Sequence, residues 1–325
     1  MSAPHEQQAP VHRRRGAFWL PGDRRQDERG PWQLGPAWVQ WEAPAELTGR
    51  PPLVLVHGGG SQSTDWLGTT GAAPGWADLA VAAGFPVYLL DRPGHGRSPG
   101  DPARLGSRTP FPDYAGAGFL VPPDGDRAAA HSGWPWGRTP GSAHLDAQVA
   151  SSAGMLVDAA LGQELDARRL VDLLARTGPA VVVTHSAGAP AGWLAADGRP
   201  ELVRALVALE PLGPPGLDLG LLGLQGRLDG GLTCRPLRRD DDGRLPGLAR
   251  VPVCVVTADA SGRAAADART VSFLRDGGVP VDHLLLAEHG VHGNGHGFPS
   301  EVGNDRSFAL VAGWLADRGG GQPTG

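Results

Sequence analysis

The chain has 325 residues and a formal net charge of −5 at pH 7, so its charge gives no reason to expect a nucleic acid or an anionic membrane as a partner. Its length suits one large α/β domain with insertions better than two domains. No apolar run reaches the length of a membrane span, and the absence of Lys, together with 50 Gly and 31 Pro, is interpreted as compositional bias.

Both ends of the chain are predicted to be flexible tails, residues 1–15 and 319–325. The short apolar run 17–20 is followed at once by Pro, Gly and Asp, so the apolar core of a signal peptide is not found. We therefore expect a cytoplasmic protein. In that setting two unlinked thiols, Cys234 and Cys254, are favoured over a disulfide.

Short apolar runs bounded by turn residues predict the strands of a sheet. They lie at 17–20, 37–41, 53–56, 87–91, 180–184, within 202–210, at 253–257 and at 281–286. We expect the first two to form an antiparallel edge. Predicted helices lie at 76–83, 158–176, 189–197, 264–275 and 308–315. Strands and helices alternate from residue 53 onwards, which indicates an α/β fold with a doubly wound, mostly parallel sheet.

Two insertions interrupt this alternation. Residues 99–142 are rich in Pro, Gly and Asp and show no helix or strand pattern. A segment of this length inside a compact domain favours a lid or binding loop over a disordered insertion, and Trp134 and Trp136 favour packing. The Leu- and Gly-rich segment 212–250 is predicted to be a cap over a pocket. The two insertions and the sheet together form one predicted domain, residues 16–318.

Ser186 is the candidate nucleophile. It follows the buried run 180–184 and precedes a predicted helix, and a Ser at such a turn forms a nucleophile elbow. The small residues Ala187 and Gly188 suit a strained turn, although Thr184 replaces the first Gly of the usual G-x-S-x-G. The alternative is a Ser that caps the helix, which the buried strand before it makes less favoured.

A Ser hydroxyl needs a neighbouring base to become a nucleophile at neutral pH, and the loop 288–299 offers three His residues. Their spacing could place metal ligands on one face of a helix, but the interspersed glycines argue against a helix, so no metal is expected. His289 lies too close to the preceding strand. From the residues alone, His292 and His296 both remain candidates.

Polar or Gly-rich groups follow four predicted strands, as they do at catalytic edges of open parallel sheets. Four motifs stand out. In chain order they are HGGG at 57–60, D-x-P-x-x-G-R-S at 91–98, Glu210 after the strand that follows Ser186, and G-N-x-H at 293–296. In this order they resemble the α/β-hydrolase superfamily, and more narrowly bacterial serine esterases with a Glu acid after that strand. The resemblance covers about residues 37–318.

The resemblance implies His296 as the base. The acid, which must reach the ring of that His, is implied either at Asp259 or at Glu210. We favour Glu210, because the position at which the superfamily usually carries its acid, just past the strand 253–257, falls nearer Ser261 than Asp259. For either carboxylate the alternative is a solvated charge at a strand end.

The same resemblance implies an oxyanion hole made by the backbone amides of Gly59 and Ala187, with Gly60 as the second choice in the glycine loop. A phosphate cradle is disfavoured because the Gly-Lys-Ser/Thr of a P-loop is missing. His57 and His185 are interpreted as packing and hydrogen-bonding residues, and no chemistry is assigned to His95.

We therefore expect a cofactor-free serine hydrolase that cleaves a carboxylic ester of a small, partly apolar molecule through an acyl-enzyme. The alternatives are an acyltransferase or lactonase that uses the same Ser, His and acid, or a non-catalytic binding protein of the same fold. The expected partner is the small-molecule ester, with no nucleic acid and no membrane. The sequence predicts no oligomeric state.

Overall fold

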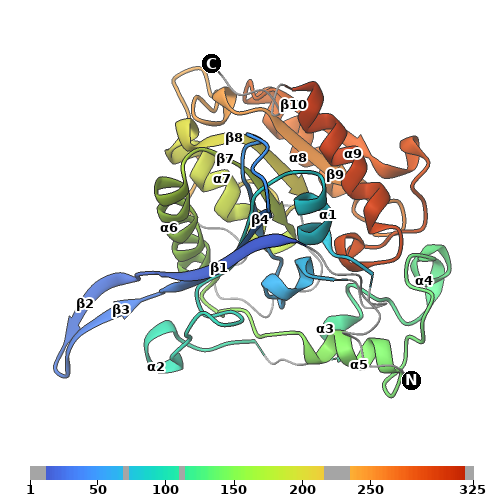
Figure 1. The fold of residues 1–325 in the computed structure, drawn as a ribbon, viewed down its shortest axis with the longest axis horizontal. Coiled ribbons are helices and arrows are strands. Elements are labelled where there is room, and N and C mark those ends of the chain that lie inside the picture. Colours follow the sequence, from blue (N-terminus) through green and yellow to red (C-terminus); the bar gives the residue numbers. More distant parts are fainter. Residues whose placement is uncertain (1–11, 69–72, 110–113, 216–234, 319–325) are drawn as a thin grey trace.

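The computed structural model describes residues 12–68, 73–109, 114–215 and 235–318 (Figure 1). Its central sheet contains the strands β1 (Arg13–Leu20), β4 (Ala37–Pro44), β5 (Leu53–Val56), β6 (Val87–Asp91), β7 (Ala180–His185), β8 (Val203–Leu209), β9 (Val253–Thr257) and β10 (Val281–Leu285). Their order is β1-β4-β6-β5-β7-β8-β9-β10. Neighbours from β6 to β10 pair in parallel, which confirms the predicted fold class.

The antiparallel edge that we expected is present, because β4 runs antiparallel to both β1 and β6. One boundary was wrong: β1 begins at Arg13, so residues 13–15 belong to the sheet and not to a tail. The reason is an ion-pair cluster in which the Arg13 guanidinium contacts the carboxylates of Glu42 and Asp78. Residues 1–11 and 319–325 lie outside the described part of the chain.

A second, two-stranded sheet was not predicted. Strands β2 (Asp23–Asp27) and β3 (Gly30–Leu34) form an antiparallel hairpin that projects from the edge of the main sheet (Figure 1). Its first strand reads Asp-Arg-Arg-Gln-Asp, and those residues lie mostly exposed. Charged residues without an apolar alternation carry no strand signal, so the pattern gave no sign of this hairpin.

Helices cover both faces of the main sheet. One face packs against α6 (Ala159–Thr177), α7 (Ala189–Gly198) and α8 (Ala264–Asp276), and the other against α1 (Trp76–Ala82) and α9 (Asn304–Asp317). Along β5, Val54 and Val56 join the first core, whereas Leu53 and Leu55 join the second. This alternation explains why the central strands are apolar throughout. No helix within the described ranges is long and apolar enough to cross a membrane.

Short helices were missed in the first insertion. The described part of 99–142 contains α2 (Pro102–Leu105), α3 (Tyr114–Ala117) and α4 (Gly125–Ala130), and α5 (Ala143–Ala150) follows it. Helices of four to six residues are too short to show an amphipathic period. The insertion is anchored by Trp134, which packs against Leu145 and Val149 of α5.

The second insertion packs against the body of the protein in its described part, 235–250. Leu237, Leu245 and Leu248 are buried in the core beside α7, and Nε of Arg238 lies 3.3 Å from the carboxylate of Asp197 at the end of that helix. Residues 216–234, the middle of the predicted cap, lie outside the described residues. Single-turn helices complete the described chain: η2 (Ser63–Trp66), η3 (Ser186–Gly188), η4 (Pro200–Leu202), η5 (Leu248–Arg250), η6 (Leu286–His289) and η7 (Phe298–Ser300).

Candidate active site

Ser186 stands on the sharp turn between β7 and α7. Its φ is +49°, and Glu210 at the end of β8 has a φ of +41°. In the described chain these are the two non-glycine residues with a positive φ. Such backbone strain costs on the order of 1–3 kcal/mol per residue and tends to occur at functional sites. Both strained residues are ones that the sequence singled out.

Thr184 occupies the place of the first Gly of the elbow motif, and the structure shows how it is accommodated. Its side chain is buried against α7, at the position of Gly192. A Cβ on Gly192 would lie 2.9 Å from the Thr184 methyl group and 2.8 Å from Cδ1 of Leu206. Gly192, on the helix that packs against β7, therefore leaves the room that the Thr184 side chain occupies.

A continuous hydrogen-bond chain joins Ser186, His296 and Glu210. The Ser186 hydroxyl lies 2.8 Å from Nε2 of His296, and Nδ1 of the same ring lies 2.6 Å from Oε2 of Glu210. The other carboxylate oxygen, Oε1, accepts a hydrogen bond from the backbone N–H of Ala258 at 2.8 Å. With Nδ1 donating to the carboxylate, the lone pair of Nε2 faces the hydroxyl proton.

Burial opposes a charge on either member of the His296–Glu210 pair. It lowers the pKa of His296 well below 6.5, and the charges of Arg263 and Arg127 lower it further. It also raises the pKa of Glu210, while the hydrogen bond with the Ser261 side chain and the charge of Arg263 oppose this rise. The imidazole is therefore neutral at rest and able to accept a proton.

The alternative acid and base form a separate pair. Nδ1 of His292 lies 3.2 Å from Oδ2 of Asp259, and Oδ1 accepts a hydrogen bond from the N–H of Gly293 at 2.9 Å. The His292 side chain is 65% exposed, and His289 is exposed too. Within the described residues, no group of three or more His, Cys, Asp or Glu side chains could hold a metal ion.

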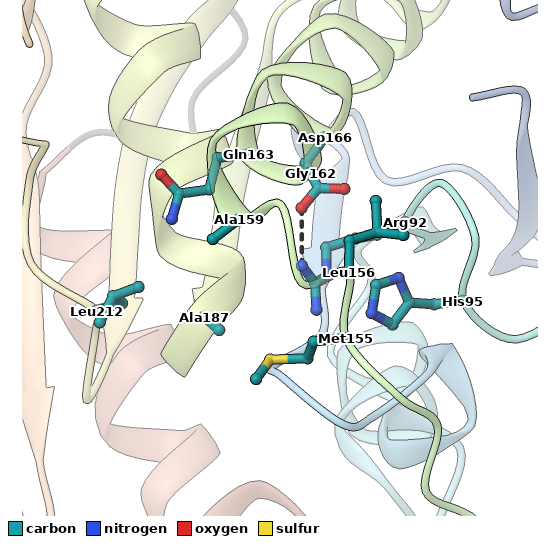
Figure 2. A pocket seen from close by; sticks show the side chains of 10 residues that line it. All are labelled: Arg92, His95, Met155, Leu156, Ala159, Gly162, Gln163, Asp166, Ala187 and Leu212. Atoms are coloured by element: carbon teal, nitrogen blue, oxygen red, sulfur yellow. Dashed lines mark hydrogen bonds and ion pairs between the residues drawn. The ribbon is translucent and has the colours of Figure 1, made fainter. Parts of the chain in front are cut away.

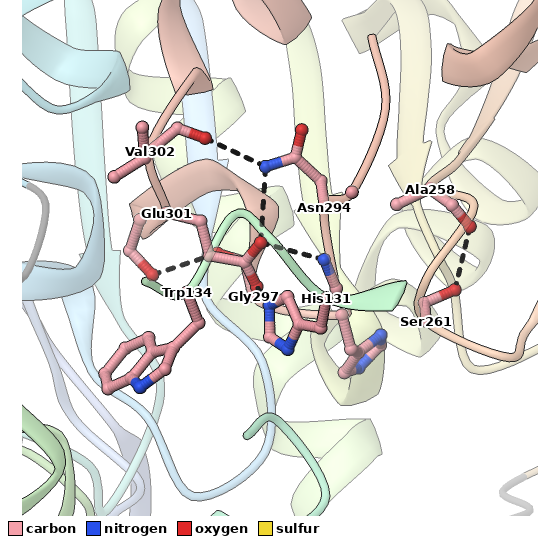
Figure 3. Close-up of polar contacts among 12 residues, drawn as sticks. His131, Trp134, Ala258, Ser261, Asn294, Gly297, Glu301 and Val302 are labelled. Carbon is pink, nitrogen blue, oxygen red and sulfur yellow. Dashed lines mark hydrogen bonds and ion pairs between the residues drawn. The ribbon is translucent and has the colours of Figure 1, made fainter. Parts of the chain in front are cut away.

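A buried carboxylate that the sequence did not indicate, Glu301, holds the loop that carries His296 (Figure 3). Its Oε2 accepts hydrogen bonds from the N–H of Gly295 at 2.8 Å and from the amide of Asn294 at 3.2 Å. Its Oε1 lies 3.0 Å from Nε2 of His131, which belongs to the first insertion. Glu301 thus fixes the backbone directly before His296, and no motif around it could have revealed this.

His185 also fixes this loop, as a hydrogen-bonding residue. Its Nε2 lies 2.8 Å from the carbonyl oxygen of His296 and donates to it. Burial lowers the pKa of His185 to about 3, with the charge of His296 as the second cause. His57 is likewise buried and accepts a hydrogen bond from the N–H of Arg92 at Nε2, 3.1 Å away.

The glycine loop after β5 is held by a buried ion pair (Figure 2). The Arg92 guanidinium donates to the carbonyl of Gly58 at 2.6 Å and to the carboxylate of Asp166 on α6 at 2.7 Å. Gly59 lies against Ala187, and a side chain at Gly59 would collide with the sulfur of Met155. The backbone of Gly59 therefore lies close to the side chain of Ala187, whose amide is the other proposed donor.

Two cavities flank these residues. One, of about 440 Å³ and partly open to solvent, lies over Ser186 and is also lined by His296 and Gly59. Residues of the first insertion line it as well, and the ring of Phe119 lies 4.8 Å from that of His296. The other, of about 370 Å³, lies on the Ala187 side; besides the Arg92–Asp166 pair it is lined by Met155, Leu156, Ala159 and Leu212 (Figure 2).

Known proteins are similar to this chain in sequence or in fold. Over 322 aligned residues the chain is 29% identical to a protein of Fungal sp. (strain ATCC 74256) described as "Probable secreted lipase phiG"; the match covers 86% of this chain and 85% of that one. A solved structure, "The Atomic Resolution Structure of a Novel Bacterial Esterase", matches with a TM-score of 0.67 at 19% identity and covers 96% of this chain and 98% of that one. A family model described as alpha/beta hydrolase fold matches residues 51–229, more than half of the chain. The chain therefore belongs to the α/β-hydrolase fold family.

Proposed function

We propose that this protein is a serine hydrolase that cleaves carboxylic esters of small, partly apolar molecules through an acyl-enzyme on Ser186. The observation that carries the proposal is the hydrogen-bond chain from the hydroxyl of Ser186 through His296 to Glu210, with distances of 2.8 and 2.6 Å. A nucleophile, a base and a group that orients the base make up the constellation that acyl transfer requires.

The reaction begins when Oγ of Ser186 attacks the ester carbonyl carbon while its proton moves to Nε2 of His296. Glu210, bonded to Nδ1, keeps the ring in the correct tautomer and stabilises the imidazolium while it exists. His296 then gives the proton to the oxygen of the departing alcohol, which leaves the acyl group on Ser186. A water molecule attacks this acyl-enzyme, with His296 again accepting and returning a proton.

The negative charge that develops on the carbonyl oxygen needs donors that are already in place. We assign this role to the backbone amides of Gly59 and Ala187; a Cβ built on Gly59 would lie 3.1 Å from the Cβ of Ala187, the residue after Ser186. The Arg92–Asp166 ion pair, through its bond to the Gly58 carbonyl, fixes the glycine loop in this position. A preorganised donor of this kind contributes roughly 3–4 kcal/mol to transition-state stabilisation.

An ester is the proposed substrate for two reasons. An alkoxide departs more easily than an amine, and the similar proteins are described as a lipase and an esterase. The apolar side chains on the Ala187 side, such as Met155 and Leu212, suit the hydrocarbon part of an acyl group. The sequence-based expectation of a cytoplasmic location stays a prediction, and the fungal protein's description as secreted points the other way.

The test is hydrolysis of a chromogenic butyrate ester by the wild type and by Ser186→Ala, with Ser272→Ala on the exposed side of α8 as the matched control. We expect Ser186→Ala to lower kcat by a factor on the order of 10⁴ or more, and Ser272→Ala to keep wild-type turnover. Equal turnover by the wild type and Ser186→Ala would refute the proposal.

A further inference from the structure

The cavity over Ser186 adjoins a second lobe that the proposed reaction does not use. This lobe has a volume of about 330 Å³ and shares Ser61, Leu120, Gln148 and His185 with the nucleophile's cavity. Beyond the shared residues it is lined by Asp65 and Trp66 of η2 and by the segment just after His296, including Ser300. The lining residues that they share make the two cavities immediate neighbours.

Several of the side chains that line this lobe carry hydrogen-bonding groups. A carboxylate from Asp65, hydroxyls from Ser61 and Ser300, and the amide of Gln148 all line it. No Arg is among the described residues that line it, and its two imidazoles, His57 and His185, have lowered pKa values and stay neutral. The lobe thus presents the carboxylate of Asp65 as a hydrogen-bond acceptor. Among the described residues that line it, no cationic side chain pairs with this carboxylate.

Asp65 has the Ser61 side chain as a hydrogen-bond partner and lies near a second carboxylate, that of Asp91. Burial raises the pKa of its carboxyl to about 6; a hydrogen bond with Ser61 opposes this shift, and the nearby charge of Asp91 adds to it. Asp91 is already engaged by the guanidinium of Arg97 at 2.9 Å, so that cation is directed to Asp91. A partly buried carboxylate that faces a cavity gains most from a ligand that donates a hydrogen bond.

The position of the lobe indicates which part of an ester, the acyl chain or the alcohol, would bind in it. His296 must protonate the oxygen of the departing alcohol, so the alcohol lies on the His296 side of the Ser186 hydroxyl. The lobe is on this side, since it is lined by His185, whose ring lies 4.8 Å from that of His296, and by Gly297. The mainly apolar cavity beside Ala187 lies on the other side of the nucleophile and remains for the acyl chain.

We propose that the lobe around Asp65 is a binding subsite for an alcohol moiety that carries a further free hydroxyl group, and that Asp65 selects such esters over those of simple alkanols. This inference rests on the proposed ester hydrolysis and adds the class of alcohol. Two hydroxyls and an amide line the lobe beside the carboxylate, and they match a hydroxylated alcohol, which both donates and accepts. A site that hydrogen-bonds a substrate hydroxyl discriminates strongly against the analogue that lacks it, because its own polar groups are then left unpaired.

The experiment uses the full-length enzyme and a ladder of ω-hydroxyalkyl butyrates with two to six carbons in the alcohol, each paired with the alkyl butyrate of equal length. The quantity measured is the ratio of kcat/KM for the hydroxylated ester to that for its alkyl partner. We expect the wild type to favour the hydroxylated ester by about tenfold or more at the spacer length that reaches Asp65, which corresponds to about 1.4 kcal/mol. Asp65→Ala should bring this ratio close to one, and Asp65→Asn, whose amide oxygen still accepts, should retain part of it.

Asp241→Ala, which removes an exposed carboxylate remote in sequence from the cleft, is the matched control and should keep the wild-type ratio. A ratio near one in the wild type at every length, or a ratio that Asp65→Ala and Asp65→Asn leave unchanged, would overturn the subsite while ester hydrolysis stands. If the wild type hydrolyses none of these esters, the proposed function and the subsite both fail. Because the result is a ratio measured on one protein sample, partial misfolding of a variant does not imitate the effect.

Discussion

The carboxylate of Glu210, at the end of β8, lies 2.6 Å from Nδ1 of His296, which makes it the acid that we propose for the site. Asp259, at the end of the next strand, bonds instead to the exposed His292. This difference leads to our first prediction. Glu210→Gln should lower kcat by a factor of about 10⁴, because a Gln amide can favour the wrong tautomer of the imidazole.

Asp259→Asn is the matched control for that variant and should keep turnover within a few-fold of the wild type. Both are measured as kcat and KM on one butyrate ester, with KM expected to change little in either. A large loss in Asp259→Asn together with near-normal Glu210→Gln would reassign the acid.

The second prediction concerns pH. Burial and the charges of Arg263 and Arg127 lower the pKa of His296 well below 6.5. A lowered pKa means that the ring stays neutral, and hence able to act as a base, as the pH falls through 6.5. We expect kcat/KM to stay level through this range and to decline only at lower pH, with a midpoint below that of an ordinary His. An acid limb centred at pH 7 or above would contradict this account of the buried ring.

The third prediction concerns the unusual elbow. Gly192→Ala should destabilise the protein by about 1–3 kcal/mol, because the added methyl collides with Thr184 and Leu206. Adding Thr184→Gly should restore part of the loss by removing one of the two collisions. The readout is the free energy of unfolding in urea for both single variants and the double variant.

Gly198→Ala is the matched control for the elbow variants, since it lies in the same helix and nothing comes within 4 Å of an added Cβ. It should be neutral or slightly stabilising. Strictly additive effects of Thr184→Gly and Gly192→Ala would show that the two residues do not share the space as described.

The fourth prediction tests the buried carboxylate of Glu301, which holds the loop that carries His296. Glu301→Ala removes the acceptor of the Gly295 N–H and should lower kcat roughly 10- to 100-fold through misplacement of His296. Glu301→Gln, which keeps one oxygen, should recover much of this loss. An exposed acid on η6, Glu288, provides the control variant Glu288→Ala.

A purely structural role would predict a different pattern for Glu301. It would lower the amount of folded protein and leave kcat per folded molecule unchanged. The comparison therefore needs titration of folded enzyme alongside kinetics, and an unchanged kcat in Glu301→Ala would rule out the positioning role.

The sequence predicted the main sheet and its edge because buried strands are apolar on both faces and bounded by turn residues. It also named Ser186, His296 and Glu210, which the fold brings into contact although they lie 86 and 110 residues apart in the chain. Here the resemblance was needed to choose His296 over His292, since nothing local distinguishes the two rings. Only the folded loop shows that one is buried and the other exposed.

Other features depend on contacts that leave no local pattern. The β2–β3 hairpin is made of charged residues, and the helices of the first insertion are too short for a period to appear. Glu301 acts through bonds to a loop and to His131, 170 residues earlier in the chain, so its role arises only in three dimensions. Asp65 likewise becomes a candidate only once the fold places its cavity beside the one over Ser186.

The most direct measurement of the central claim is the mass of the protein after reaction with a fluorophosphonate, followed by peptide mapping. The account predicts one adduct, located on Ser186, that forms rapidly in the wild type, much more slowly in His296→Ala, and not at all in Ser186→Ala. Labelling that is absent from well-folded wild type, or that persists on another residue in Ser186→Ala, would contradict it.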